Sequence, residues 1–339
     1  MIGKLIKAVY TVIVASLLFG SAIYAYASAN KAEANENALP DEITLDYANW
    51  NLISLVIHEK GLLDEEFKDD DVKINWVFSP GGNKGMEYLL SGSADIAVSA
   101  EVPPLLSSIN GNPITSVYVV YVGQYAILAS PESGIKDLQG LKGKNTAVTL
   151  STAPHTFLIK ALDLAGIDIK ELNLIPLQQA DGKSMLLQGK VDAFVGGAVN
   201  WTLAEIGGGK VIYRNPDLID YNVLNVRNEF LRQYPVAVYK VLLTYEKAKK
   251  WARDNPDEFV DLVVKRTKVS SEVARPMIQL YDFTVNGITD KAIDALIKTG
   301  QLLQKTGSLK KDIEVESAVR KLYDKKFYEG YSIWKQKQI

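Results

Sequence analysis

Residues 74–100, INWVFSPGGNKGMEYLLSGSADIAVSA, decide the fold. The stretch opens with β-branched and aromatic residues, continues with a helix-forming run that ends at a glycine, and closes with a second apolar run. This pattern predicts a strand, a helix and a second strand. That order at this spacing is typical of a βαβ unit with parallel strands, so we expect an α/β fold.

The turn inside this unit, residues 79–83, reads Ser-Pro-Gly-Gly-Asn. Glycines let backbone amides approach a ligand without a Cβ in the way, and the N-terminus of a helix favours an anion. A plain tight turn also needs glycine, so the turn alone is compatible with both interpretations. Its glycine spacing and the lack of a Lys-Ser/Thr ending exclude a nucleotide P-loop. Lys84, which follows, is interpreted as a surface lysine.

The alternation of strands and helices continues on both sides of the unit. From about Asn228 onward the apolar spacing is almost wholly helical. Two successive α/β series predict two lobes rather than one long sheet. The further strands are expected at residues 42–48, 116–122 and 125–130 in the first series, and at 145–150, 172–177, 191–197 and 210–214 in the second.

Composition limits the function. The 339 residues are 47% hydrophobic, enough to bury the cores of two lobes, and a formal net charge of -2 provides no general attraction for nucleic acid. Cysteine is absent and the only histidines are His58 and His155. Thiolate metal sites and disulfides are therefore excluded and multi-histidine zinc sites nearly so, and we expect neither a metal nor a cofactor.

The N-terminal residues are typical of an export signal. Lys4 and Lys7 precede an apolar run that ends in the small-residue sites 25–27 and 27–29. This layout predicts a secretory signal peptide over residues 1–29, with an uncleaved membrane anchor as the alternative. Residues 30–42 are predicted to be a polar linker, and the folded body is expected to begin near Ile43.

Three other strand ends carry small, hydroxyl-bearing or acidic residues. These are Glu101 before two prolines, residues 151–155 with the sequence Ser-Thr-Ala-Pro-His, and the pair Gly196 and Gly197. In open α/β sheets ligands bind outside the carboxyl ends of the strands, so the four loops are expected to meet in one cleft if the sheets face each other. Such a cleft suits a small polar molecule, an anion above all. No loop places a general base beside a nucleophile, so no catalysis is expected.

The chain resembles the periplasmic substrate-binding proteins of ABC importers for aliphatic sulfonates, taurine and nitrate. The resemblance rests on the order and spacing of residues 46–67, 77–106, 135–167 and 186–197. It implies a two-lobed, type II-like periplasmic binding protein fold, in which each lobe is a mostly parallel sheet flanked by helices. The chain would cross between lobes near Ser130 and near Asn225, so that lobe 1 comprises residues 43–130 and 226–339 and lobe 2 comprises 131–225.

The loops and the resemblance together give a set of candidate ligand-binding residues. His155 has the alternative role of a buried spacer, and Trp201 that of a packed helix tryptophan. Where many relatives read Trp-Asp-Pro, residues 197–201 read Gly-Ala-Val-Asn-Trp, without an acidic group for an amino substituent, so a taurine-like zwitterion is disfavoured. The candidates are Trp50, Asn51, Ser79, Gly81, Gly82, Asn83, Glu101, Ser151, Thr152, His155, Gly196, Gly197 and Trp201.

The resemblance implies a monomeric, non-enzymatic protein that closes about its hinge over a small organic anion, most plainly an alkanesulfonate. It would deliver this ligand to the permease subunits of an ABC transporter, in the periplasm, or at the cell surface if the N-terminal helix is retained. The alternatives are a binding protein for nitrate or a vitamin-precursor pyrimidine, a pyrimidine-precursor synthase-like enzyme, and a sensory module held at the membrane. The synthases depend on histidines and a cysteine-rich metal segment, whereas this sequence has only two histidines and no cysteine.

Overall fold

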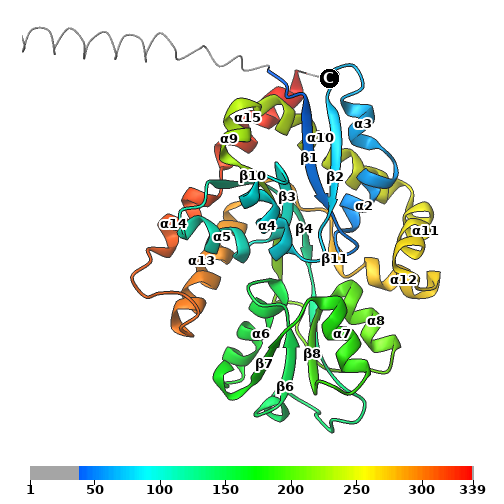
Figure 1. Ribbon diagram of the computed structural model, residues 1–339, viewed down its shortest axis with the longest axis vertical. Coiled ribbons are helices and arrows are strands. Elements are labelled where there is room, and N and C mark those ends of the chain that lie inside the picture. The colour runs from blue at the N-terminus through cyan, green and yellow to red at the C-terminus, as the bar shows by residue number, and fades with distance from the viewer. Residues whose placement is uncertain (1–37, 338–339) are drawn as a thin grey trace, which may run out of the picture.

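A computed structural model describes residues 38–337 of the chain (Figure 1). The predicted signal peptide and most of the predicted linker lie outside the described residues. Within residues 38–337 the fold is α/β, as predicted, with two separate sheets flanked by helices. No helix in this range is long and apolar enough to span a bilayer.

Sheet A has six strands in the order β11-β4-β10-β3-β1-β2. The βαβ unit predicted from residues 74–100 is present, with α4 between β2 and β3, and β1 pairs in parallel with both strands. The strands are β1 (Glu42–Tyr47), β2 (Lys73–Phe78), β3 (Ile96–Ala100), β4 (Ile114–Gly123), β10 (Asp220–Arg227) and β11 (Tyr281–Asp282).

Sheet B has five strands in the order β7-β6-β8-β5-β9. Both sheets are mixed rather than mostly parallel. The strands next to the crossings pair antiparallel, β10 with β3 and β4, and β5 with β8 and β9. The reason is that the chain leaves sheet A along β4 and returns along β10 in the opposite direction. The strands are β5 (Tyr125–Ala129), β6 (Asn145–Val148), β7 (Asn173–Pro176), β8 (Ala193–Gly197) and β9 (Lys210–Arg214).

The chain passes between the sheets at two connections, and both lie earlier than expected. The first is the single residue Gln124, between β4 and β5, and the second is residues 215–219, between β9 and β10. Ser130 follows β5 of sheet B, and Asn225 lies inside β10 of sheet A. The first predicted position is therefore six residues too late, because β4 and β5 form one nearly continuous apolar run, and the second is six to ten residues too late.

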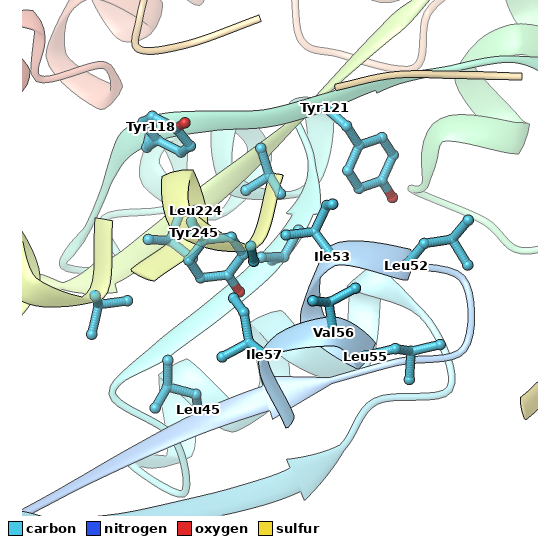
Figure 2. Packing of buried hydrophobic residues seen from close by; sticks show 14 of the residues in the cluster. Leu45, Leu52, Ile53, Leu55, Val56, Ile57, Tyr118, Tyr121, Leu224 and Tyr245 are labelled. Atoms are coloured by element: carbon cyan, nitrogen blue, oxygen red, sulfur yellow. The ribbon is translucent and has the colours of Figure 1, made fainter. Parts of the chain in front are cut away.

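Helices cover both faces of sheet A. Figure 2 shows one face, where Tyr245 of α10 belongs to the same cluster as Leu224 of β10 and Ile57 of α2. On the other face α5, α13 and α14 pack together around Leu105 and Val319. The helices of this lobe are α2 (Leu52–Glu59), α3 (Leu62–Glu66), α4 (Gly82–Ser91), α5 (Val102–Ile109), α9 (Asn228–Gln233), α10 (Pro235–Asp254), α11 (Pro256–Thr267), α12 (Ser271–Ile278), α13 (Asp290–Lys305), α14 (Val315–Leu322) and α15 (Lys325–Gln336).

Sheet B has a smaller core on each face. Phe157 of α6 is fully buried on one face, and Phe194 of β8 is buried on the other beside α8. Each lobe therefore has its own hydrophobic core, as rigid-body movement about a hinge requires. The helical segments are the short η1 (Gln139–Leu141) and η2 (Ile169–Glu171), and the α-helices α6 (Ala153–Leu164), α7 (Gln179–Leu187) and α8 (Ala198–Ile206).

Candidate binding cleft between the lobes

A cavity of about 50 Å³ lies between the two sheets, at the hinge. Among the described residues 38–337, no residue that lines it is an aspartate, glutamate, lysine, arginine or histidine, so this part of the wall carries no formal charge. Residues from both lobes and Gln124 of the hinge contribute. They are Trp50, Gly81, Gly82, Ala100, Pro103, Tyr121, Gly123, Asn222 and Tyr281 from the first lobe, and Tyr125, Thr149, Thr152, Ala153, Pro154, Gln179, Gly197, Ala198, Val199 and Asn200 from the second.

Five helices begin at this cavity, and each has at least one lining residue at or within two positions of its N-cap. The N-cap residues are Gly81 of α4, Glu101 of α5, Thr152 of α6, Gln178 of α7 and Gly197 of α8, and none makes a side-chain capping hydrogen bond. Uncapped N-termini leave backbone amides without partners and carry partial positive charge. Their convergence makes an uncharged cavity suited to an anion.

Two glycines let α4 approach its neighbours. A Cβ on Gly82 would lie 3.0 Å from the Cβ of Ser99, so α4 packs directly on β3. A Cβ on Gly81 would lie 2.7 Å from Asn83 Oδ1 and 2.7 Å from Gln178 Oε1. Since Gln178 belongs to the second lobe, Gly81 is a point where the two lobes approach closely.

Aromatic side chains form the first-lobe wall. The Trp50 Nε1 group donates to the carbonyl oxygen of Ser79 at 3.2 Å, and the rings of Tyr121 and Tyr281 have centroids 5.2 Å apart. Burial raises the pKa values of Tyr121, Tyr125 and Tyr281 above their usual range, so these phenols stay neutral at physiological pH. The wall therefore offers apolar surface and neutral hydroxyl groups.

Asn222 of β10 provides an unused donor. Its side chain is 3% exposed and lines the cavity, and its Nδ2 makes no well-formed hydrogen bond within residues 38–337, although the Tyr125 hydroxyl is a near neighbour. By contrast, the hydroxyls of Thr149 and Thr152 already donate, to the carbonyl oxygens of Leu177 and Thr149 at 2.7 and 2.5 Å. Apart from the phenol hydroxyls, the donors left for a ligand are thus mainly amides.

The structure brings together five of the thirteen candidate residues expected at the ligand. Of the others, Ser79 and Asn51 lie just behind the wall: the Ser79 hydroxyl donates to the carbonyl oxygen of Gly81 at 2.8 Å, and the Asn51 side chain caps α2. Asn83 lies beside Gly81. The five that line the cavity are Trp50, Gly81, Gly82, Thr152 and Gly197.

The remaining five candidates do not line the cavity. Glu101 is fully buried below it. Gly196 packs against the ring of Phe194, which leaves no room for a Cβ at this position. Ser151 is exposed and has a φ of 55°. His155 accepts a hydrogen bond at Nδ1 from the Ser151 amide at 3.4 Å, and burial lowers its pKa, so it is a neutral spacer rather than a cation.

Trp201 has the packed role that the sequence left open as an alternative. It is 3% exposed in the second lobe's own core with Phe194, and its Nε1 donates to Glu205 at 3.1 Å. It is therefore not a wall residue of the cavity. Lys84 Nζ forms an ion pair with Glu87 Oε2 at 2.6 Å on the surface of the protein, in agreement with its interpretation as a surface lysine.

Sequence reasoning missed the residues that the hinge and the later strands supply, among them Tyr121, Gln124, Asn222 and Tyr281. Asn222 and Tyr281 reach the cavity through the pairing of β10 and β11 with β4, far apart in the sequence. The Gly-Gln break at residues 123–124, which interrupts two apolar runs, is the one local signal that could have indicated the hinge.

Relatives were found among curated proteins. A protein from Bacillus subtilis (strain 168) that is named as an aliphatic sulfonates-binding protein is 26% identical to this chain over 283 residues. The match covers 82% of this chain and 85% of the relative. A protein of the same name from Escherichia coli (strain K12) is 26% identical over 240 residues, 67% of this chain and 72% of the relative. Both relatives are named as binding proteins rather than as enzymes.

Solved structures share the fold. The alkanesulfonate-binding protein SsuA from Xanthomonas axonopodis pv. citri, bound to MOPS, has a TM-score of 0.75 at 19% identity, covering 83% of this chain and 98% of that one. The nitrate-binding protein NrtA from Synechocystis PCC 6803 has a TM-score of 0.71 at 14% identity, covering 87% and 89%. The desulfurization enzyme DSZB has a TM-score of 0.61 at 16% identity, covering 86% and 99%. The TM-scores show that this chain shares the periplasmic binding protein fold. Sequence identities this low support no statement beyond the fold.

A family model described as NMT1/THI5 like matches residues 59–259, which is more than half of the chain. The match covers the βαβ unit, both hinge connections and all of the second lobe. This chain therefore belongs to the NMT1/THI5-like family.

Proposed function

We propose that the protein is a solute-binding protein that captures a small organic anion, an aliphatic sulfonate, by closing its two lobes about the hinge. The observation that carries this proposal is the convergence of five uncapped helix N-termini on one uncharged cavity. A sulfonate group has three acceptor oxygens and one negative charge, which suits several backbone amides better than one cationic side chain. The names of the relatives favour the same ligand.

Closure is proposed because both lobes contribute to the wall. A ligand that contacts Gly82 and Asn222 on one side and Gly197 and Asn200 on the other stabilises the closed state over the open one. The two lobes are proposed to comprise residues 38–123 with 220–337, and 125–214. Aromatic and apolar residues such as Trp50 and Val199 would hold the alkyl part.

We further propose that the protein acts as an exported monomer, in the periplasm or at the cell surface, and releases its ligand to the permease subunits of an ABC transporter. A catalytic role is not proposed, because no lining side chain is an acid, a histidine or a lysine that could act as a general base. The charge-free lining supports a binding role over an enzymatic one.

Nitrate is the second candidate. It is a small planar anion with three acceptor oxygens, and the cavity of about 50 Å³ has room for a ligand of that size. The likeness to a nitrate-binding protein adds to this alternative. A taurine-like zwitterion is disfavoured because no acidic side chain lines the cavity to pair with its ammonium group.

The test is a thermal-shift and calorimetric titration of the purified protein with methanesulfonate, ethanesulfonate, taurine and nitrate. Sulfonate buffers must be left out, since they are themselves candidate ligands. A rise in Tm with the two alkanesulfonates and a smaller one with taurine is expected, because a ligand that binds only the folded state stabilises it. A rise with nitrate and none with any sulfonate would replace the ligand assignment.

A further inference from the structure

Two carboxyl groups lie buried beside the cavity, close to the hinge. Glu101 follows β3 and Asp220 is the first residue of β10, directly after the second hinge connection, and both are 0% exposed. Ala100, next to Glu101, and Asn222, two residues after Asp220, pair across β3 and β10, and both line the cavity. The two acids therefore sit directly behind the wall that would meet an anion.

One cation accompanies these two acids. Lys160 of α6, in the second lobe, donates to Asp220 Oδ1 at 3.2 Å and to the carbonyl oxygen of Ile219 at 3.1 Å. On the other side, the Tyr323 hydroxyl donates to Glu101 Oε2 at 3.5 Å. Two ionised carboxylates with one ammonium would leave a net negative charge in a dry interior, which is costly.

Each acid also has one oxygen without a partner. Glu101 Oε1 and Asp220 Oδ2 are buried and make no well-formed hydrogen bond within residues 38–337, although the backbone amide of Tyr221 lies near the Glu101 carboxyl. Buried polar atoms are rarely left unpaired. One proton on either carboxyl group would remove the excess charge.

We propose that Glu101 and Asp220 share one proton, and that the lobes close over an anion only while this proton is held. The second half of the proposal rests on the proposed function. With the proton, Glu101, Asp220 and Lys160 are together neutral. Without it, one extra negative charge is buried behind the anion cavity and beside the hinge, where it repels the ligand.

The surroundings favour the protonated pair. Burial, and then the charge of Asp220, raise the pKa of Glu101 to about 8, while Lys160 acts against this rise. Burial raises the pKa of Asp220 as well, against the lowering effect of Lys160. The other titratable groups facing the pair are phenols: Tyr125 of β5, Tyr221 of β10, which also feels Asp282, and Tyr323 after α14. Burial raises the pKa of each phenol, so all three are neutral at the pH values concerned.

The first experiment needs no ligand. The Tm of the wild type and of Glu101→Gln is measured between about pH 5 and about pH 9.5. A carboxyl whose pKa is raised on folding contributes stability below its unfolded pKa, and loses this contribution as pH rises through its folded pKa. As pH rises to about 8, the Tm of the wild type should therefore fall by a few degrees relative to the Tm of Glu101→Gln. Above about pH 8 this Tm difference should stay constant. Parallel profiles overturn the proposal.

Two further variants keep this experiment decisive. Lys160→Met removes the ammonium that lowers both carboxyl pKa values, so the pH at which the loss levels off should rise; an unchanged or lower pH contradicts the shared proton. Asp46→Asn is the matched control. Asp46 is a buried acid of β1, and burial raises its pKa to about 7. The Tm difference between the wild type and Asp46→Asn should therefore level off near about pH 7 rather than about pH 8.

The second experiment is calorimetric titration with methanesulfonate in Tris and in bicine, which differ in ionisation enthalpy. Wild-type affinity should fall above about pH 8, by up to about tenfold per pH unit for one proton, with net proton uptake on binding. Glu101→Gln should show neither the fall nor the uptake. If anions bind with the same pH-independent affinity in both proteins, the inference fails and the proposed function stands. If the Tm profiles behave as expected but no anion binds at any pH, the proposed function fails, and with it the coupling to closure.

Discussion

The Tyr281 hydroxyl donates a hydrogen bond to the carbonyl oxygen of Trp50 at 3.1 Å, across 231 residues of sequence. It connects β11 at the edge of sheet A to the turn before α2, and both residues line the cavity. The Trp50 indole donates in turn to Ser79, whose hydroxyl donates to Gly81. These bonds hold the first-lobe wall as one unit.

Tyr281→Phe should loosen this wall. The substitution removes one buried hydrogen bond and leaves the Trp50 carbonyl without that donor, which should lower the free energy of unfolding by about 1 kcal/mol. Affinity for the ligand should fall several-fold because the wall is less well ordered. Urea denaturation and calorimetric titration measure the two effects. Tyr213→Phe, in β9 and away from the cavity, is the chemical control and should leave affinity unchanged.

Gly81→Ala should hinder closure. The added Cβ would lie 2.7 Å from Asn83 Oδ1 and from Gln178 Oε1, and Gln178 belongs to the other lobe. The φ of Gly81 is -166°, which any residue adopts, so the substitution adds bulk without backbone strain. We expect affinity to fall about fivefold with little change in Tm of the ligand-free protein, since a clash of this size shifts the closed state by about 1 kcal/mol.

The partner variant Gln178→Ala tests the cause of that effect. If the clash with the Gln178 side chain is what hinders closure, the double variant Gly81→Ala, Gln178→Ala should regain most of the lost affinity. Two effects that simply add would show that the residues act separately. A variant at Gly82 is less informative, because its Cβ would press on Ser99 in the same lobe and disturb the packing of α4 on β3.

Two tryptophans should separate stability from binding. Trp201→Ala empties a site in the second lobe's core, where a loss of about 3–5 kcal/mol is expected, but affinity should stay unchanged while the protein is folded. Trp50→Ala removes part of the cavity wall and should weaken binding more than it lowers stability. Denaturation midpoints and titrations at low temperature measure both. A large loss of affinity in the Trp201 variant would return this residue to the site.

Local patterns were sufficient to predict the βαβ unit and the loops that meet at the cavity. Residues 74–100 contain the strand, turn, helix and strand of the structure, and the glycine turn lies at the cleft because the carboxyl ends of parallel strands share one edge. The two lobes followed from the repetition of the pattern. These features depend on the local sequence and on general rules of chain topology.

The hinge and the second half of the site depend on pairing that local patterns do not reveal. Strands β4 and β5 form one apolar run, so only the assembled sheets show that the chain changes lobe at Gln124. Asn222 reaches the cavity because β10 pairs with β4, and Tyr281 because β11 does. Trp201 was a candidate because it lies in the segment where many members of the resembled family read Trp-Asp-Pro. In the structure it lies on α8 and packs into the second lobe's own core.

Lys249 should make stability rise with pH. It lies 1% exposed in α10, and its Nζ donates to the carbonyl oxygens of Val119 and Val285 at 3.1 and 2.7 Å and to the Tyr118 hydroxyl at 3.1 Å. Burial lowers its pKa from 10.5 to about 7, so between these values the unfolded chain binds more protons and stability increases with pH. Lys249→Met removes this dependence but leaves the two carbonyl oxygens without that donor. Urea denaturation at several pH values should therefore find the variant less stable near about pH 10, with a difference that narrows toward about pH 7. A difference that stays constant over this range would contradict the lowered pKa.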